Sequence, residues 1–571
     1  MIYPIGHTAR RMKYKGLSFY HPFAFWMGCS AIVAGVLSHI PMFLHAAPMG
    51  FHMAGMPMST TMLVGMAFIP LGLILSGYGL TPRLNQLAKS DASQLHFHVA
   101  DGIPLNCEHW KLIFALFVAV VVDVMKPATL GFVMPGMTVE YLISNQAVGT
   151  LVLVAMTGTT VGSVLWGRIS DIFGRRAAII LSALMFIGTA ICGAMPSFNW
   201  NLVMCFLMGL SAGGLLPITF TLMAESVPSA HRGWLLVALG GFGTAAGYLA
   251  AAGSAALLEP IFSWRSLWLL GLPTGLLIIG LNHYIPESPR YLMRKGLKQE
   301  ARAVLARFSG DSTSRDDGVV IEVVPDEKKG ALQLLGNPYS GITAGLMAGG
   351  AAWGIVNFGF LLWLPTNLRT LGFGHHADTL IAQSAFIALP CVALAIFLYY
   401  RWSSINALVA FLLFNGISLL MFCSLSWFNI QSASAFFIAT SFLLMSASGV
   451  IAMLIPYAAE IYPVHLRGTG AGLIAASSKF GGIIGATLGL LGLFNNMEHA
   501  ALILACLLFL SALLLLKNGI DTRGLRLEEI QASIRTNAAP KNNTVKGIDA
   551  DELVINEPSS PTCYLDPEDL K

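Results

Sequence analysis

Two ionisable side chains and a proline lie together in one apolar segment, VVVDVMKPATLGFVMP (120–135). In a helix, Asp123 and Lys126 share one face, because side chains three residues apart are neighbours. A charge near the middle of a membrane costs about 2.5–3.5 kcal/mol on insertion scales and usually faces an internal cavity. Pro127 lacks the N–H group that would bond the carbonyl of Asp123, so that carbonyl is free to bind an ion or a substrate. The segment therefore predicts a binding site for a proton or a polar ligand.

Membrane-spanning helices must position these side chains. Of the 571 residues, 55% are hydrophobic and 11% are charged, and the mean hydropathy is +0.69. A soluble core cannot hide that much apolar surface, so we expect an all-α integral membrane protein in a lipid bilayer. A spanning helix needs about 20 apolar residues. The sequence contains fourteen such runs, which begin near residues 23, 59, 111, 147, 177, 200, 234, 265, 340, 377, 404, 434, 470 and 498.

Basic residues predict the orientation of these helices, because lysine and arginine near helix ends stay in the cytoplasm. With the amino terminus inside, the exceptions among the 33 basic residues are Arg265 and Arg369 in outer loops and Lys126 and Lys479 inside helices. We therefore expect a multi-pass protein of a bacterial inner membrane with both termini cytoplasmic. The net charge of +4 then reflects topology, and no basic surface for nucleic acid is indicated. Lys479 is expected to reach the membrane interface by snorkelling, and contact with the substrate is the alternative.

Polar stretches divide the chain into seven parts. They are a cytoplasmic amino terminus (1–22), an extra transmembrane hairpin (23–80), a cytoplasmic connector (81–110), a first six-helix bundle (111–284), a cytoplasmic central loop (285–339), a second six-helix bundle (340–516) and a disordered cytoplasmic tail (517–571). Within the central loop, residues 296–308 have apolar side chains at helical spacing among charges, which predicts a short amphipathic helix.

One charged pattern occurs in both bundles. AESVPSAHRG contains Glu225 and Arg232, and AEIYPVHLRG contains Glu460 and Arg467 at the same spacing. The repetition indicates two related halves, an architecture in which transporters place their substrate site between the repeats. We expect both Glu–Arg pairs to lie where their helices enter the cytoplasm, close enough to exchange partners as the halves rock. The alternative is an ordinary salt bridge at each rim, which would contribute little.

The sequence GRISDIFGRR (167–176), here called the signature loop, gathers glycines and charges. Gly167 and Gly174 permit a tight turn with close backbone approach. Its charged residues can bond helix ends and acids such as Glu225, which would latch one conformation; they are Asp171, Arg175 and Arg176. The alternative is that these arginines only anchor the topology.

Together these motifs resemble the major facilitator superfamily over roughly residues 111–516. The signature loop resembles that superfamily's loop between its second and third helices, although Ile172 stands where a second basic residue is usual. PESPRYL (286–292) and the twin Glu–Arg elements are similar to the sugar porter and organic-ion branches. This resemblance implies that Glu225 with Arg232, and Glu460 with Arg467, are gating pairs. The resemblance implies two six-helix bundles that alternate access to a central site, here with two additional amino-terminal helices, fourteen in total.

Segment 120–135 resembles the first helix of the aromatic-acid:proton symporters and of the niacin-transporter and synaptic-vesicle-protein-like group. Asp123, Gly131 and Pro135 match, whereas Lys126 stands where that helix often has a second acid. Two hypotheses follow. Either Lys126 holds an anionic substrate while Asp123 carries a proton, or the two charges neutralise each other as a structural pair.

Two further residues are candidates for the substrate site. NFGFLLWLP (357–365) resembles the seventh helix of the same group, and GLSAGGLLP (209–217) resembles its fourth. Trp353 can stack on a planar substrate and Asn357 can fix its orientation. Aromatic residues at helical spacing are more often packing residues, so Asn357 is the stronger candidate.

The outer segment of the hairpin combines imidazole and thioether side chains, which suit copper. The candidate ligands are His45, Met49, His52, Met53 and Met56. Because methionine is a common gap filler and no thiolate or tight ligand repeat is present, the principal expectation is no metal. A lid, an assembly surface or simple stabilisation is the preferred role of the hairpin.

The predicted function is secondary active transport by alternating access, with protons and a small organic carboxylate moving together. No cofactor is expected, and the expected partners are a small-molecule substrate, protons and the lipid bilayer. The first alternative is a sugar or polyol:proton symporter, although a charged pair does not suit a neutral sugar. Different classes are a copper importer or sensor that uses the hairpin and a non-transporting receptor. An enzyme is not expected, because no nucleophile–base constellation is present.

Overall fold

The computed structural model describes residues 21–80, 95–97, 104–295, 297–309, 321–323, 331–374, 376–462, 464–522 and 534. The predicted amino terminus before residue 21, much of the connector and nearly all of the tail lie outside the described residues. Within the described ranges, fourteen helices are long and apolar enough to cross a membrane. Their first residues lie within a few positions of the predicted starts, so the predicted number and placement of spans are confirmed.

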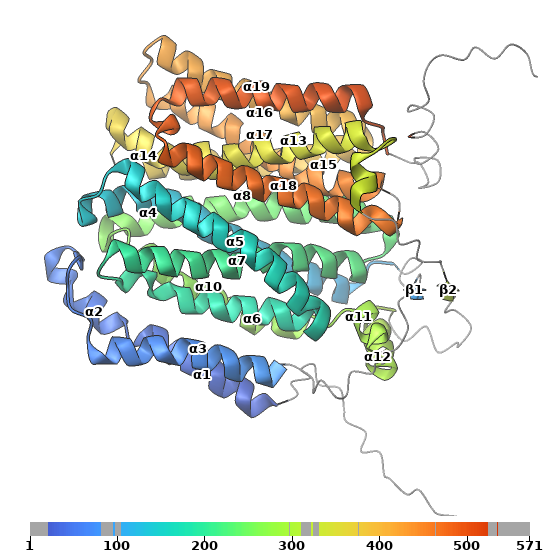
Figure 1. Cartoon of the computed structure of the whole chain (residues 1–571), viewed down its shortest axis with the longest axis horizontal. Helices are drawn as coiled ribbons and strands as arrows, with labels where there is room; N and C mark the ends of the chain where they lie inside the picture. Colours follow the sequence, from blue (N-terminus) through green and yellow to red (C-terminus); the bar gives the residue numbers. More distant parts are fainter. Residues whose placement is uncertain are drawn as a thin grey trace, which may run out of the picture.

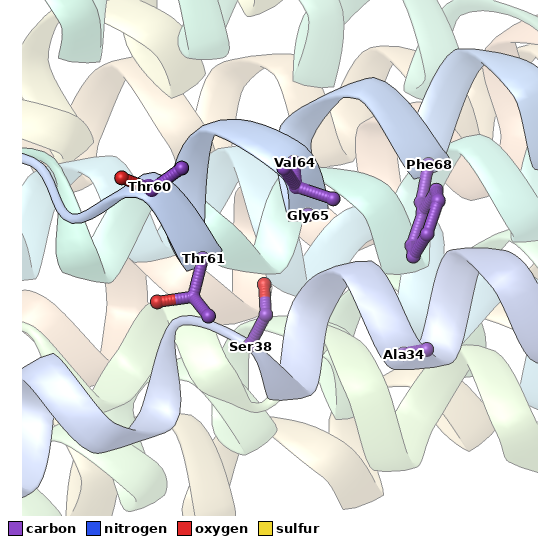
Figure 2. Close-up of a pocket in the computed structure, with 7 residues that line it drawn as sticks. All are labelled: Ala34, Ser38, Thr60, Thr61, Val64, Gly65 and Phe68. Carbon is purple, nitrogen blue, oxygen red and sulfur yellow. The ribbon is translucent and has the colours of Figure 1, made fainter.

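The two additional helices form a hairpin beside the first bundle (Figure 1). Its elements are α1 (Pro22–Leu37), α2 (Ile40–His45), η1 (Ala47–Met49) and α3 (Thr60–Leu80). Gly28 and Gly72 let α1 and α3 approach closely, because a Cβ atom at either one would lie 2.6 Å from the carbonyl oxygen of the other. A groove of about 280 Å³ lies between the end of α1 and the start of α3 (Figure 2). It is lined by Ala34, Ser38, Thr60, Thr61, Val64, Gly65 and Phe68.

The first bundle contains six spans. Its elements are α4 (Cys107–Tyr141), α5 (Asn145–Phe173), α6 (Arg175–Gly188), η4 (Thr189–Ala194), α7 (Phe198–Ser226), α8 (Ser229–Phe262), α9 (Ser266–Leu269), α10 (Gly271–Leu281) and η5 (Asn282–Tyr284). The glycines at 209 and 213 pack directly on the backbone of α5 at Ala155 and Thr159. The glycines of GLSAGGLLP therefore let α7 pack tightly against α5.

The second bundle also contains six spans. Its elements are α13 (Ser340–Ile355), the π-helical η7 (Val356–Phe360), α14 (Leu361–Leu368), the π-helical η8 (Arg369–Phe373), α15 (His376–Arg401), α16 (Ser404–Trp427), α17 (Ala433–Ile461), α18 (Val464–Leu490), η9 (Leu493–Asn495) and α19 (Met497–Asn518). The segment from α13 through η8 acts as one span.

Between the bundles lie α11 (Pro289–Arg294), the predicted amphipathic helix α12 (Lys298–Ser309) and η6 (Ala331–Leu335). Ala301, Val304 and Phe308 are the buried residues of α12. Arg307 donates to Glu108 at 2.5 Å, so α12 is docked on the start of α4. Outside the spans, β1 (Leu95–Phe97) pairs antiparallel with β2 (Ile321–Val323). The all-α prediction did not include this short pair, but it describes the membrane part correctly.

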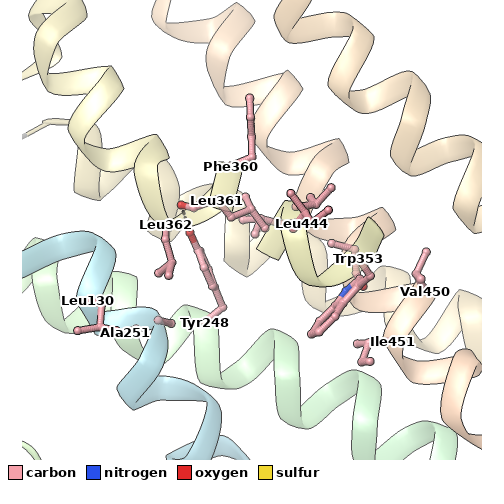
Figure 3. Packing of buried hydrophobic residues seen from close by; sticks show 14 of the residues in the cluster. Leu130, Tyr248, Ala251, Trp353, Phe360, Leu361, Leu362, Leu444, Val450 and Ile451 are labelled. Atoms are coloured by element: carbon pink, nitrogen blue, oxygen red, sulfur yellow. Dashed lines mark hydrogen bonds between the residues drawn. The ribbon is translucent and has the colours of Figure 1, made fainter. Parts of the chain in front are cut away.

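The two bundles meet along α4, α5 and α8 of the first and α14, α15, α17 and α18 of the second (Figure 1). Gly131 of α4 touches the second bundle, because a Cβ atom there would lie 2.7 Å from the carbonyl oxygen of Leu362. Figure 3 shows Tyr248 and Ala251 of α8 facing Leu361 and Leu362, and the Tyr248 hydroxyl donates to the Leu361 carbonyl at 3.4 Å. The interface is therefore a packed apolar surface, and the polar groups in it require a specific explanation.

Candidate functional site

Asp123 lies in α4 with only 6% of its surface exposed. Its Oδ1 atom is buried and has no hydrogen-bond partner among the described residues. The charge that acts on this carboxyl group is the ammonium of Lys479, which belongs to α18 in the second bundle. A buried carboxylate oxygen without a donor is costly, so this position is suited to a proton or a bound ligand.

Lys479 connects the two bundles near the middle of its span. Its ammonium donates to the Ser163 hydroxyl of α5 and, at 3.2 Å, to the Gly213 carbonyl of α7. The expectation that Lys479 snorkels to the interface is wrong, because α18 begins early enough to place this residue well inside the span. The sequence analysis did not identify Ser163 as a partner of this lysine. A single lysine inside an apolar run was the signal available for this site.

Lys126 is fully buried inside the first bundle. The sequence placed it on the same helix face as Asp123, but its ammonium has other neighbours. Its ammonium donates to the Trp268 carbonyl at 3.2 Å and lies 5.2 Å from the centre of the Phe186 ring. Neither an ion pair nor an electrostatic interaction joins it to Asp123 among the described residues. The hypothesis that Asp123 and Lys126 neutralise each other as a structural pair is therefore wrong. Three residues of a helix fall short of a full turn, and the long lysine stem carries its charge toward α9 and α10.

Asn357 and Trp353 lie in the span that crosses beside Lys479. A Cβ atom at Gly354 would clash with the Ser478 carbonyl oxygen, so this span and α18 touch next to the lysine. Asn357 is half-buried in a π-helical turn, a feature that is frequent at functional sites. The Trp353 indole donates to the Ala447 carbonyl at 2.9 Å inside the second bundle, which favours the packing alternative for this residue. We call Asp123, Ser163, Asn357 and Lys479 the central site.

The signature loop surrounds a carboxyl group that the sequence reasoning had not selected. Glu287 accepts hydrogen bonds from the backbone N–H of Arg175 at 2.7 Å and of Arg176 at 3.2 Å, at the start of α6. Gly174 has φ of 108°, and a Cβ atom there would clash with Glu287. Burial raises the pKa of the Glu287 carboxyl to about 7, although the N–H groups of Ser288 and Arg175 lower it. The predicted turn at Gly174 is therefore confirmed, and its reason is the carboxyl group.

Gly167 does not have the role expected for it. It lies inside α5, and a Cβ atom there would meet no other atom within 4 Å. Asp171 is also largely exposed, at 67%, with one oxygen 3.3 Å from Arg175. The close approach expected at Gly167 is therefore wrong, because the helix continues through this position to Phe173.

Arg175 and Arg176 bind partners in and next to the first bundle. Arg175 lies 3.3 Å from Glu225 and donates to the Ser170 carbonyl at 3.1 Å. Arg176 donates to Asn282 at 2.9 Å. These contacts join the end of α5 to α7 and to the segment after α10, which gives this end of the first bundle a fixed shape. We call this end of the first bundle the signature end.

The repeated Glu–Arg elements lie at the signature end as well. Glu460 accepts from the Tyr399 hydroxyl at 2.8 Å and from Thr522 at 2.7 Å, and its other oxygen would lie 3.2 Å from a Cβ atom at Gly233. Gly233 belongs to α8, so this contact crosses from the second bundle to the first. Arg232 donates to the Val227 carbonyl at 3.3 Å.

The expected pairing of Glu460 with Arg467 cannot be compared with the structure, because the Arg467 side chain lies outside the described residues. At the opposite end, Arg369 of the second bundle donates to both oxygens of Glu259 in α8, at 2.9 and 2.7 Å. The two bundles therefore touch on both sides of the central site.

The five candidate copper ligands differ in their exposure. His45, Met49 and His52 are exposed, whereas Met53 is buried. Met53 and Met56 pack in an apolar cluster with Met42, Phe43 and Met62. Among the described residues, no group of three or more histidines, cysteines or acids could hold a metal. The methionines therefore join the hairpin loop to the bundle as packing residues.

Among the described residues, twelve spans in two bundles around a buried polar site, with a hairpin of two further spans, define a multi-pass membrane transporter. The sequence model of the Major Facilitator Superfamily matches residues 112–486, so the chain belongs to that family. It is a transporter and not an enzyme.

Three curated relatives are similar over most of the chain. The niacin transporter NiaP of Acinetobacter baylyi is 26% identical over 75% of this chain and 98% of its own length. The 4-hydroxybenzoate transporter PcaK of the same organism is 27% identical over 70% and 88%, and the gallate transporter of Pseudomonas putida is 26% identical over 73% and 94%. The xylose transporter XylE from Escherichia coli, in a partially occluded inward-open conformation, aligns with a TM-score of 0.60 at 17% identity, covering 74% of this chain and all of that one. That likeness shows the fold alone.

Proposed function

We propose that this chain is a proton-coupled symporter of a small aromatic carboxylate. The observation that carries the proposal is that the ammonium of Lys479, from the second bundle, enters the first bundle, where a buried oxygen of Asp123 has no hydrogen-bond partner among the described residues. Niacin, 4-hydroxybenzoate and gallate, the compounds in the names of three relatives, are all planar rings with one carboxyl group. An anion of this kind needs one positive partner and a flat, mostly apolar site.

The charges of the central site account for coupling. When Asp123 is ionised, it neutralises Lys479 inside a low-dielectric interior, where opposite charges attract strongly. When Asp123 takes up a proton, the ammonium of Lys479 is left without a counter-charge, and a substrate carboxylate can bind it. The proton and the anion then cross together as a neutral load. Lys479 replaces Lys126 in this role, and Asn357 orients the ring.

The gating residues act around this site. Glu460 and Gly233 bring the bundles together at the signature end, and the contacts of Arg175 and Arg176 with Glu225 and Asn282 shape the surface on which the second bundle closes. Asp171 supports Arg175 from the exposed side. Because each contact involves a charged group and few atoms, it can break and re-form as the bundles rock.

The protein is placed in a bacterial inner membrane with both termini cytoplasmic. The bacterial relatives support the membrane assignment, and the positions of the basic residues support the orientation. The signature end then faces the cytoplasm, and the end with Arg265 and Arg369 faces outward.

Proton flux in proteoliposomes tests the proposal. A luminal pH dye should report acidification after external aromatic carboxylates are added, but not after sugars and polyols, and the Asp123→Asn variant should lose the signal. Acidification with sugars would favour the sugar porter alternative. Silence with both pools would overturn the proposal and leave the receptor alternative for a ligand-binding assay.

A further inference from the structure

An ion cluster at the end opposite the signature loop contains two carboxyl groups and one guanidinium group. Arg369 of η8 donates through one nitrogen to Glu259 at 2.7 Å and to Asp378 at 2.5 Å, and through the other to Glu259 at 2.9 Å. The side chains of Arg369, Glu259 and Asp378 are only 16%, 5% and 2% exposed. Glu259 belongs to the first bundle, whereas Arg369 and Asp378 belong to the second. The cluster therefore closes the bundle interface at this end.

The two carboxyl groups share one guanidinium nitrogen and lie within hydrogen-bonding range of each other. An ionised carboxylate only accepts hydrogen bonds, so a hydrogen bond between two carboxyl groups requires a proton on one of them. Two carboxylates at this distance cannot both stay ionised at low cost, and one arginine neutralises only one of them. The Oδ1 atom of Asp378 is buried without a hydrogen-bond partner among the described residues.

Few other titratable groups face this cluster within the described part of the chain. Tyr248 of α8 interacts electrostatically with Asp378, and its hydroxyl donates to the Leu361 carbonyl. His376 lies two residues before Asp378 and is exposed. Neither provides a second positive charge that is buried beside the carboxyl groups.

We infer that Glu259, Asp378 and Arg369 form a second proton-binding site, and that this end of the transporter closes with one proton shared between the two carboxyl groups. Opening separates Glu259 from the other two residues, which lets water reach both acids and releases the proton. The inference concerns a site apart from Asp123 and does not depend on the identity of the substrate. Because one proton is linked to closure, the ratio of open to closed molecules should rise with pH by up to about tenfold per unit, between the pKa of the acids in the open form and the pKa of the closed cluster.

The opening can be measured directly with a pair of labels. Leu257 in α8 and Leu371 in η8 are exposed and lie near the cluster, one in each bundle. With cysteines at these two positions, and with Cys563 and the exposed Cys107 and Cys506 replaced by serine, spin labels on the full chain in nanodiscs report the separation of the bundles. No substrate is added, so the measurement is independent of transport.

In the unmodified cluster, the population with the longer separation should grow as pH rises. Asp378→Asn keeps one carboxylate and one arginine, so its separation should stay short at every pH, and Glu259→Gln should lose the pH response too. An Asp378→Asn variant that responds to pH as before, or that is open at every pH, would overturn the inference. If Asp378→Asn does not fold, as judged by size-exclusion chromatography, Glu259→Gln decides by the same criterion: a retained pH response overturns the inference.

Two control variants test whether the pH response belongs to the cluster or to another titratable residue. Glu498→Gln changes an acid of the second bundle that contacts Ser426 and not Arg369, and it should leave the pH response unchanged. His376→Gln removes the nearby described histidine, and it should also leave the response unchanged. A response abolished by either substitution would assign the titration to that residue and overturn the inference.

Discussion

Asp123 and Lys479 belong to different bundles, yet each acts electrostatically on the other across their interface. The lysine is held there by Ser163 and Gly213 of the first bundle. In the proposed transport cycle, a charge pair that spans the interface would tie the protonation of one bundle to the position of the other. This relationship makes the two residues the first targets for mutation.

Replacing Asp123 by asparagine should abolish uphill accumulation of an aromatic carboxylate, because the amide cannot bind and release a proton as a carboxyl group does. Exchange of labelled for unlabelled substrate should persist, since exchange needs no net proton movement. Both are measured in the same proteoliposomes with an imposed pH gradient. Undiminished pH-driven uptake would show that the proton is carried elsewhere.

The two buried lysines provide a matched comparison. Lys479→Gln should weaken binding of an aromatic carboxylate by about tenfold or more, because a hydrogen bond to a charged group contributes about 1.5–3 kcal/mol. Lys126→Met should leave the dissociation constant nearly unchanged, because that ammonium faces Trp268 and Phe186. Equilibrium binding to purified protein measures both. The opposite order of effects would return the anion site to Lys126.

Glu287 should make the stability of the signature end depend on pH. Its folded pKa of about 7 exceeds the ordinary value of 4.5, so the folded state binds this proton more tightly than the unfolded state. The contribution of this group to stability should therefore decrease as pH rises from about 4.5 to 7, and it should be constant outside that window. Thermal unfolding of the unmodified protein and of Glu287→Gln isolates this contribution as a difference between two pH profiles. Parallel profiles would contradict it.

Deleting residues 1–80 should leave transport partly active. The loop of the hairpin reaches the first bundle through the N–H groups of Met53 and Ala54, which donate to Glu140 at 2.7 and 3.1 Å. Glu140 also lies 2.6 Å from Arg265 and accepts a hydrogen bond from Trp264 at 3.0 Å. These partners belong to the first bundle, so we expect the ion pair to remain after the deletion. Substrate uptake and the melting temperature are measured together. A folded, inserted and fully inactive product would assign the hairpin a direct part in transport.

Much of the fold was predictable from the sequence, because its determinants are local. Each span is a run of about 20 apolar residues, and the starts of all fourteen spans follow from hydropathy alone. The turn at Gly174 was also predictable, since a glycine between an apolar helix and two arginines marks a helix boundary. The partner that makes this turn necessary, Glu287, lies more than a hundred residues further along the chain and was not predictable.

The sequence by itself determined that Asp123, Lys126 and Lys479 are ionisable groups inside apolar helices, and that the chain consists of two related halves. Only the tertiary structure decided which of these charges meet. Spacing along one helix suggested Asp123 with Lys126, whereas the crossing of helices from two bundles brought Lys479 to Asp123 and Arg369 to Glu259. The physical reason is that helix periodicity fixes only the direction in which a side chain leaves its own helix. Its neighbours depend on how closely packed glycines and apolar side chains set one helix against another.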